Sequence, residues 1–517
     1  MGRRWLTAVA TALAVALGCA PGAAAAGLPL GPPGLSETRS TSAVAPGVTY
    51  TAIVRGAPSD ADGFAVDVGF TLDRAAAEQT AADLRARGES ASVVAADIHA
   101  PDSSLPGPTA YFARVGPLAS QAEAQAVAAR LTSAGFAKVR TGFTGDDGTT
   151  TTGPWRLHVL DIDPRRFDGR VAPVLATDVV PGRETVTSID ARLHALAGIN
   201  GGYFVIGDAD GTPGDLAGIS MIGGDLVSEA VDGRTDLLLP RVDGGGARIA
   251  ALETDLSARA SDGGRRLVDG INRRAGLIRS CGGDGGDLPT EQPLHDVTCT
   301  DPSELIRFTT RFGPETAPGS EVEAVLDHRG RVLAQRGGPG PIPAGGSVLA
   351  GTGDAAEWLR AHARAGARVR VTEEITTAGG RRLRDTGHAL GVVNGGPRLL
   401  ANGTPAIDAT AEGFVHPDDP QFFYAFGVRR NPRTLAGVTR DGHLLLVAAD
   451  GRAPGISVGL SFAEEAAVMR ALGATDAVNL DGGGSTTLAL GSRLVTRPSD
   501  ATGERPVGDA IVLLGGR

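Results

Sequence analysis

The chain has 517 residues but only 3 Cys, 3 Met and 3 Trp, and aromatic residues make up 4% of it. Its single lysine, Lys138, does not stand in a G-x-x-x-x-G-K-[ST] motif, so a Walker A nucleotide site is excluded. Acidic residues outnumber Lys and Arg by 59 to 49, giving a net charge of -10, and this balance argues against nucleic-acid binding. After residue 26, no stretch approaches the roughly 18 uncharged apolar residues of a membrane span.

Glycine is abundant instead, with 75 residues in short clusters that lack the Gly-X-Y period of collagen. Hydrophobic residues make up 42% of the chain and charged residues 21%, which is typical of a globular protein. At about 150 residues per domain, the length predicts roughly three domains.

The N-terminus has the features of a signal peptide. Arg3 and Arg4 form a positive region, and an apolar stretch at residues 5–17 follows that is too short for a stable membrane helix. Ala24-Ala25-Ala26 then offers a cleavage site, so we expect a signal peptide at residues 1–26 and a secreted or cell-wall-associated protein. A lipid anchor at Cys19 is the alternative.

Cleavage after residue 26 leaves two cysteines, Cys281 and Cys299. In an oxidising compartment, an even number of cysteines predicts a disulfide, which would contribute about 3 kcal/mol on the chain-entropy account. A metal-binding pair is the alternative, although no His-rich spacing supports it.

An internal repeat with an offset of 47 residues follows a segment at residues 27–60 that we interpret as a linker. Each copy alternates apolar and polar residues, then has helical spacing, and ends at a glycine. Extended runs at residues 91–96 and 137–142 follow the two helices. The order βαββαβ predicts a small ferredoxin-like sheet with both helices on one face.

Residues 61–145 resemble the SPOR (sporulation-related repeat) domain, on the basis of this repeat and the Val-Gly-Pro-Leu-Ala-Ser turn before its second helix. The resemblance implies binding to peptidoglycan glycan strands. RNA-binding modules share the topology, but the segment has neither a basic stripe nor their aromatic pattern. A purely structural spacer remains the alternative.

The rest of the chain is predicted to be β-rich, with a strand at residues 155–162, a hairpin at residues 438–447 and helices at residues 354–365 and 461–472. Residues 242–385 hold both cysteines and have their own βα pattern, which we interpret as an inserted subdomain. Gly351 begins a G-x-G-x-x-A run there, with Glu373 about 20 residues on. Because no second half-fold follows, we interpret this run as a helix start rather than a dinucleotide site.

The strongest chemical signal is at residues 477–487, which read Ala-Val-Asn-Leu-Asp-Gly-Gly-Gly-Ser-Thr-Thr. A short apolar strand leads into a carboxylate, three glycines and hydroxyl groups. Three glycines in a row cost conformational entropy, and they favour a site where the backbone closely approaches a ligand. The alternative is a tight turn.

Other clusters are Asn-Gly-Gly-Tyr-Phe at residues 200–204, Arg-Asn-Pro-Arg-Thr at residues 430–434, Asp-Gly-Arg at residues 450–452 and Glu-Arg-Pro-Val at residues 504–507. Asn-Gly-Gly alone is equally typical of a hairpin turn. Arg433 and Arg452 could bind a phosphate through two hydrogen bonds each, although each alone is typical of a surface arginine.

In this order, these motifs resemble the phosphodiester glycosidase family, whose members include α-N-acetylglucosaminidase-like enzymes that uncover mannose 6-phosphate. Glu464 also falls on a family glutamate, and the segment at residues 392–397 resembles the family's Gly-Gly-Pro segment. We therefore expect an α+β protein: a ferredoxin-like βαββαβ SPOR domain, then a β-rich mixed α/β phosphodiester glycosidase domain in two parts (153–241 and 386–517) that carries an inserted α/β subdomain (242–385).

The family resemblance implies hydrolysis of a sugar-1-phosphodiester in cell-envelope glycans, with a carboxylate near the anomeric carbon and cations around the phosphate. The predicted catalytic residues are Asp481, Asp450 and Glu464, and the predicted substrate-binding residues are Asn200, Gly201, Gly202, Arg433, Thr434, Arg452, Gly482, Gly483, Gly484, Ser485 and Arg505. Asn200 would bind the sugar or orient a carboxylate.

The sequence requires no cofactor, but it allows a divalent metal. A metal-dependent phosphodiesterase that cleaves the P–O bond is the second interpretation, with Asp161, Asp163, Asp208 and Asp210 as oxygen ligands. A non-enzymatic wall-binding protein is the third. Hydrolysis in heavy-oxygen water would distinguish C–O from P–O cleavage.

Overall fold

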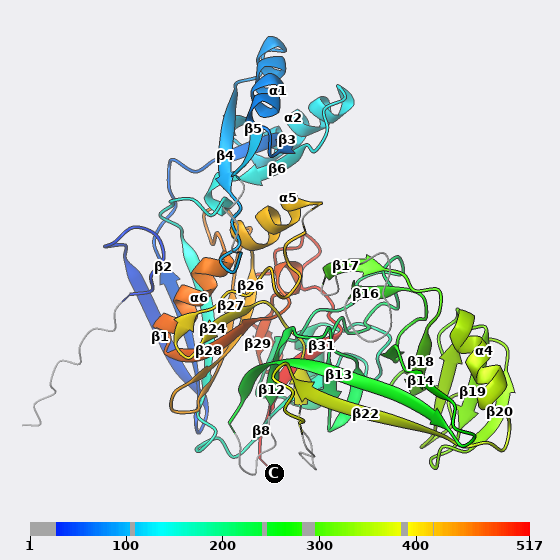
Figure 1. Cartoon of the computed structure of the whole chain (residues 1–517). Helices are drawn as coiled ribbons and strands as arrows, with labels where there is room; N and C mark the ends of the chain where they lie inside the picture. Colours follow the sequence, from blue (N-terminus) through cyan, green and yellow to red (C-terminus); the bar gives the residue numbers. More distant parts are fainter. Residues whose placement is uncertain are drawn as a thin grey trace, which may run out of the picture.

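The computed structural model describes residues 27–103, 109–239, 246–281, 295–383, 391–416 and 418–516. A small α+β domain, a large β-rich body and a lobe joined by a long two-stranded ribbon make up these residues (Figure 1). The predicted signal peptide and Cys19 lie outside the described residues. Among those described, no helix is long and apolar enough to cross a membrane.

The SPOR-like segment folds as predicted, in the order β3 α1 β4 β5 α2 β6. Its four-stranded sheet has the order β4-β5-β3-β6. The elements are β3 (Phe64–Thr71), α1 (Arg74–Ala86), β4 (Ala91–Asp97), β5 (Thr109–Leu118), α2 (Gln121–Ser133) and β6 (Arg140–Phe143). Both helices bury an apolar stripe against one face of the sheet, at Ala77, Ala81 and Leu84 in α1 and at Ala124, Val127 and Leu131 in α2. The last strand begins later than predicted, after Lys138 with its left-handed φ of 51°.

The body contains an eight-stranded antiparallel sheet with the order β1-β2-β7-β27-β26-β28-β24-β25. Its strands are β1 (Glu37–Ala45), β2 (Val48–Arg55), β7 (Trp155–Ile162), β24 (Arg398–Ala401), β25 (Thr404–Pro405), β26 (Arg433–Thr439), β27 (Leu444–Ala449) and β28 (Ala474–Asn479). The predicted strand at residues 155–162 is β7, and the predicted hairpin is β26–β27.

A five-stranded sheet packs against one face of this sheet through a wholly apolar layer that includes Leu160, Leu446, Ile199 and Ile511. Its order is β30-β29-β9-β31-β8. The strands are β8 (Arg170–Leu175), β9 (Ala197–Asn200), β29 (Leu488–Leu490), β30 (Arg493–Leu494) and β31 (Asp509–Leu514), and α3 (Val186–Leu193) precedes β9. Helix α6 (Phe462–Ala471) contacts β24 and β28 of the large sheet and belongs to a second apolar layer, with Ala466, Val468 and Met469.

The segment predicted as a linker at residues 27–60 instead supplies β1 and β2. Strand β2 pairs with β7 along its whole length, and β1 pairs with β2 at the edge of the sheet. Its Thr, Ser and Val residues alternate as strand residues do, but the Pro, Gly and Ser around them resemble a linker. The turn at Gly47 has a φ of 77° and lies against Phe167 N, so tertiary contacts hold the hairpin. The linker prediction is wrong for this stretch.

Within the predicted insertion, β13 (Arg248–Ala260) and β22 (Val369–Thr377) pair from Leu252–Thr377 to Ala260–Val369, so entry and exit lie side by side (Figure 1). This ribbon extends a sheet with β10 (Ser220–Ile222), β11 (Asp225–Ser228), β12 (Thr235–Leu239), β14 (Arg265–Leu267) and β23 (Gly391–Val393).

Beyond the ribbon stands a five-stranded sheet of β15 (Gly270–Ile271), β18 (Leu305–Thr309), β19 (Val322–Leu326), β20 (Val332–Arg336) and β21 (Ser347–Gly351). The G-x-G-x-x-A run leads into α4 (Gly353–His362), as expected of a helix start. The strands β16 (Ile278–Cys281) and β17 (His295–Cys299) form a separate hairpin.

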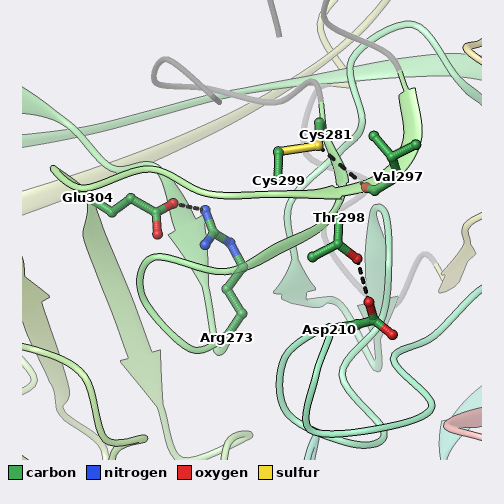
Figure 2. The surroundings of a disulfide bond; sticks show 7 residues. All are labelled: Asp210, Arg273, Cys281, Val297, Thr298, Cys299 and Glu304. Carbon is green, nitrogen blue, oxygen red and sulfur yellow. Dashed lines mark hydrogen bonds and ion pairs between the residues drawn. A yellow bond between two sulfur atoms is a disulfide. The ribbon is translucent and has the colours of Figure 1, made fainter. Parts of the chain in front are cut away.

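The predicted disulfide joins Cys281 to Cys299 and closes the β16–β17 hairpin (Figure 2). Close to it, Thr298 Oγ1 donates to Asp210 Oδ1 at 2.6 Å. This hydrogen bond fastens the hairpin to the loop that follows the Asn-Gly-Gly-Tyr-Phe motif.

Candidate functional site

The triple-glycine segment crosses from one sheet of the sandwich to the other. It leaves β28 in the eight-stranded sheet, forms a short 3-10 helix (Gly483–Ser485) and enters β29 in the five-stranded sheet. We call residues 481–485 the glycine loop. A Cβ added at Gly484 would lie 2.5 Å from Arg505 Nε, and Gly483 has a φ of 63°. The glycines are therefore required by close neighbours and by backbone conformation.

The structure brings three predicted arginines to this loop. Arg452 Nη1 lies 3.4 Å from the Cβ position of Gly483, and Arg433 Cδ lies 3.7 Å from that of Gly482. Arg505 lies against Gly484 and donates to Asp500 at 2.7 and 3.0 Å. Desolvation, and then the charges of Arg433 and Arg505, lower the pKa of Arg452. Three mutually repelling cations beside a half-buried stretch of backbone are suited to receive an anion.

Arg433, however, lies behind the loop rather than at its surface. It is 1% exposed, its Nε lies 2.8 Å from Glu465 Oε1, and its guanidinium stacks 4.6 Å from the Phe462 ring. Burial raises the pKa of Glu465 to about 8, with Arg433 opposing the shift. These contacts of Arg433 fix the start of β26. Its positive charge still reaches the glycine loop, where it lowers the pKa of Arg452.

Asp481 opens the glycine loop and is half-buried. Its Oδ1 accepts the N–H of Gly482 at 2.9 Å, and its backbone N–H donates to Gly201 O at 3.3 Å. The Asp481 backbone is also held by Asn200, whose Nδ2 donates to Asp481 O at 2.7 Å. The carboxylate is therefore fixed beside the glycine loop.

Asn200 is buried and clamps three segments together. Its Oδ1 accepts from Thr434 Oγ1 at 2.7 Å and from Thr487 N at 3.1 Å, while its Nδ2 holds Asp481. Of the two roles expected for Asn200, these contacts favour orienting the carboxylate-bearing backbone over binding sugar. Thr434 is likewise buried inside this clamp.

Asp450 is held inside the protein, at 1% exposure. Its Oδ1 accepts the N–H of Arg497 at 2.8 Å, and its Oδ2 lies 3.4 Å from His158 Nε2. His158 Nδ1 in turn lies 2.7 Å from Tyr50 Oη. Sequence reasoning missed Tyr50 and His158, because nothing local distinguishes a histidine in an apolar strand from an ordinary core residue.

Glu464 caps helix α6 rather than facing the glycine loop. It forms a capping box with Ser461 and accepts two hydrogen bonds from Arg430 Nε at 3.0 Å and one from Nη2 at 2.7 Å. Both carboxylate oxygens are thus engaged, and these contacts do not favour the predicted catalytic role.

Asp509 is a second carboxyl group near Asp481 that sequence reasoning missed. It is fully buried at the start of β31, where its Oδ1 accepts the N–H of Gly202 at 3.0 Å and its Oδ2 has no hydrogen-bond partner among the described residues. Burial, with Asp481 adding to it, raises the pKa of Asp509 to about 8. A Cβ at Gly201 would lie 2.5 Å from Asp509 Cγ, so the predicted Gly201 makes room for this side chain.

A buried hydrogen-bond network joins the segment at residues 392–397 to the site. Asn479 Nδ2 donates to Tyr203 Oη at 2.7 Å, and Tyr203 Oη donates to Gly396 O at 2.7 Å. Asn394 Oδ1 accepts the N–H of Tyr203 at 2.8 Å. Ser485 is also buried, and its Oγ has no hydrogen-bond partner among the described residues.

The proposed metal ligands do not converge. Asp161 Oδ1 lies 2.7 Å from His443 Nδ1, whereas Asp210 binds Thr298 beside the disulfide (Figure 2). Within the described residues, which include all four aspartates, no three His, Cys, Asp or Glu side chains are grouped to hold a metal ion. These side chains therefore do not fit a divalent metal at the glycine loop.

Comparison with known proteins identifies two families and a related mouse protein. The family described as "Phosphodiester glycosidase" matches residues 320–514. The family described as "SPOR domain" matches residues 60–141. A mouse protein, N-acetylglucosamine-1-phosphodiester alpha-N-acetylglucosaminidase, is 43% identical over 68 residues. Those residues span 13% of each chain.

Two solved structures are similar over most of the chain. A Burkholderia pseudomallei protein, inferred to be exported, is 38% identical with a TM-score of 0.86, and the alignment covers 94% of this chain and 98% of that one. A hypothetical protein from Synechocystis is 19% identical with a TM-score of 0.55, covering 93% of this chain and 76% of that one. The second likeness concerns the fold alone.

Proposed function

Because the chain belongs to the phosphodiester glycosidase family and carries a SPOR domain, we propose that it is an exported hydrolase that cleaves the sugar C1–O bond of a sugar-1-phosphodiester in cell-envelope glycans. One observation carries this proposal: Asp481, Arg452 and Arg505 converge on the glycine loop. An N-acetylglucosamine-1-phosphodiester is the substrate class that we favour, by likeness to the mouse protein.

The proposed reaction needs little acid catalysis. A phosphomonoester is a weak base and departs readily, whereas an ordinary glycosidase must protonate its leaving group. The protein must instead stabilise the positive charge that develops at the anomeric carbon and hold the departing phosphate. A carboxylate and a group of cations meet these two needs.

We assign the carboxylate role to Asp481, as nucleophile or as base for water. It is half-buried beside the glycine loop, whereas Asp450 is buried with both oxygens in internal contacts. Arg452 and Arg505 would bind the phosphate, together with the backbone N–H of Gly484, since those of Gly482 and Gly483 already donate to Asp481 Oδ1 and Pro432 O. Arg433 would contribute charge from behind the loop, and Asn200 would hold the Asp481 backbone in place.

The SPOR domain would keep the enzyme at the cell wall by binding peptidoglycan glycan strands. This role is in line with the predicted signal peptide and with a similar protein inferred to be exported. Natural substrates of this kind are wall or capsular polymers whose sugars are joined through phosphodiesters.

The test is hydrolysis of UDP-N-acetylglucosamine in heavy-oxygen water, followed by mass spectrometry of both products. We expect the label in the released N-acetylglucosamine, because water attacks carbon in the proposed reaction. Label in the nucleotide phosphate would overturn the proposal in favour of P–O cleavage. An Asp481→Asn variant run in parallel shows whether the activity comes from this site.

A further inference from the structure

The SPOR domain is fixed to the glycosidase body rather than tethered to it. Phe70 and Phe112, on the sheet face opposite the two helices, pack against Tyr424 with ring centroids 5.5 and 5.7 Å apart. Tyr424 begins a π-helical turn (Tyr424–Val428) that continues α5 (Pro420–Phe423), the helix lying below the SPOR domain in Figure 1. The helices thus cover one face of the SPOR sheet, and the body packs against the other face around Phe70 and Phe112.

Charged contacts reinforce this docking. Asp147 accepts hydrogen bonds from Arg114 of the SPOR sheet, at 2.5 Å, and from Arg429 of the body. Arg430 Nη1 donates to Gly145 O at 2.8 Å. On the other side of the domain, Asp102 accepts from the backbone N–H groups of Thr410 and Ala411 at 3.0 and 2.9 Å. The two domains therefore present one continuous surface.

A cavity of about 350 Å³ lies at this junction and takes its walls from both domains. The SPOR side contributes Gln121 at the start of α2 and the edge strand β6, including Arg140 and Thr141. The body contributes Asn431, Arg452 and Pro454, among others. This volume is within the usual range for ligand pockets.

The pocket is electropositive. Two of its lining arginines, Arg140 and Arg429, share the carboxylates of Asp67 and Asp147 with Arg114, which lies outside the lining. These three arginines and two carboxylates leave one positive charge. In addition, Arg452 lines the pocket, and its guanidinium donates to Asn431 Oδ1 at 2.8 Å.

Asp146 is the acid among the lining residues, and burial raises its pKa to about 7. At neutral pH it therefore offsets only part of the positive charge. An anionic ligand fits this balance better than a cationic one.

Arg452 connects the pocket to the proposed reaction centre, since it lines the pocket and also lies 3.4 Å from the Cβ position of Gly483. We propose that the interdomain pocket is a second subsite, which binds the phosphorylated glycan on the leaving-group side of the scissile bond. The assignment rests on the proposed function, in which Arg452 holds the phosphate: whatever the phosphate is bonded to must extend past Arg452. The SPOR domain then forms part of the substrate site.

The test compares two substrates in the full chain. One is the methyl phosphodiester of α-N-acetylglucosamine 1-phosphate, and the other carries the same phosphodiester on the 6-hydroxyl of chitotetraose. Gln121→Trp fills the pocket from the exposed first turn of α2. Gln79→Trp, the same change on the exposed surface of α1, is the matched control.

We expect Gln121→Trp to lower kcat/KM for the chitotetraose substrate at least tenfold and to leave the methyl substrate within twofold. The control should leave both within twofold. An equal effect of Gln121→Trp on both substrates, or none on the larger one, would overturn the proposal. Thr141→Trp replaces Gln121→Trp if melting curves show that the first variant is unfolded.

A binding measurement separates this inference from the proposed function. Calorimetric titration with chitotetraose 6-phosphate requires no turnover, so it reports on the pocket even if the enzyme cleaves neither substrate. Wild-type binding that weakens at least tenfold in Gln121→Trp, and not in Gln79→Trp, supports the subsite. Binding that is equal in all three proteins refutes it.

Discussion

Replacing Gly484 by alanine should disable Arg505, the arginine that we propose binds the phosphate, without unfolding the protein. The new methyl group would lie 2.5 Å from Arg505 Nε, and the nearest atoms all belong to this one guanidinium. Ordinary contact between such atoms needs about 3.5 Å, so the guanidinium must move by about 1 Å or more. That movement breaks its paired hydrogen bonds to Asp500, at 2.7 and 3.0 Å.

The expected effects on stability and activity differ in size. Arg505 and Asp500 are both partly exposed, so losing their pairing should cost at most about 1 kcal/mol. Losing a cation at a transition-state phosphate should instead cost about 3 kcal/mol, a fall in kcat/KM of about 100-fold. We therefore expect Gly484→Ala to lower Tm by no more than about 4 °C while most of the activity is lost.

Steady-state kinetics with UDP-N-acetylglucosamine and thermal melts provide the assay. Gly207→Ala is the control, because a Cβ there meets no atom within 4 Å. In the double variant with Arg505→Ala, the second change should cost little more, since both substitutions remove the same interaction. A Gly484→Ala enzyme within threefold of wild-type kcat/KM would show that Gly484 does not act through Arg505. Losses that multiply in the double variant would show the same.

Three further predictions concern acidic and basic side chains around the loop. Asp481→Asn should lower kcat at least about 1000-fold. Its Tm should be unchanged, because the amide can still accept the Gly482 N–H. Appreciable residual turnover would assign the carboxylate role to another residue. Arg433→Ala should lower the free energy of unfolding by about 3–5 kcal/mol, since it leaves the Glu465 carboxyl buried alone. Adding Glu465→Ala should restore part of the lost stability. Urea titration of the single and double variants checks both expectations. Asp509→Asn should flatten the pH dependence of stability. Burial raises the pKa of Asp509 to about 8, so its stabilising contribution is present below about pH 4 and is lost as pH rises towards 8, by up to about 1.4 kcal/mol per pH unit. Urea unfolding of wild type and variant between pH 5 and 8 measures this slope, and identical slopes would contradict the prediction.

Much of the fold could be predicted from the sequence where the signal is local. The duplicated βα pattern predicts the SPOR fold, the alternation at residues 155–162 predicts β7, and the Ser461 capping box accompanies a predicted helix that is α6. The strands β1 and β2 could not be recognised, because their alternation is interrupted by linker-like residues and their partner β7 lies about 100 residues away. The pairing of β2 with β7 depends on tertiary contacts between distant segments.

The candidate site could also be predicted from the sequence only in part. The motifs indicated the glycine loop and its arginines, since an acidic residue before three glycines is unusual in any local structure. They did not indicate that Arg433 and Glu464 are engaged by Glu465 and Arg430, because each contact joins residues at least 32 positions apart. Nor did they indicate Asp509, whose pKa is raised mainly by burial and also by the charge of Asp481.

Residue types and motifs alone indicated the class of chemistry that we propose, because carboxylates, arginines and glycines are groups that a phosphodiester site in any fold requires. The sequence also determined the local elements, since hydrophobic periodicity acts over a few residues. The three-dimensional packing was needed to show which of these charges reach the glycine loop and which are buried as supports. It also placed the SPOR domain against the body, because burial and docking depend on contacts between segments hundreds of residues apart.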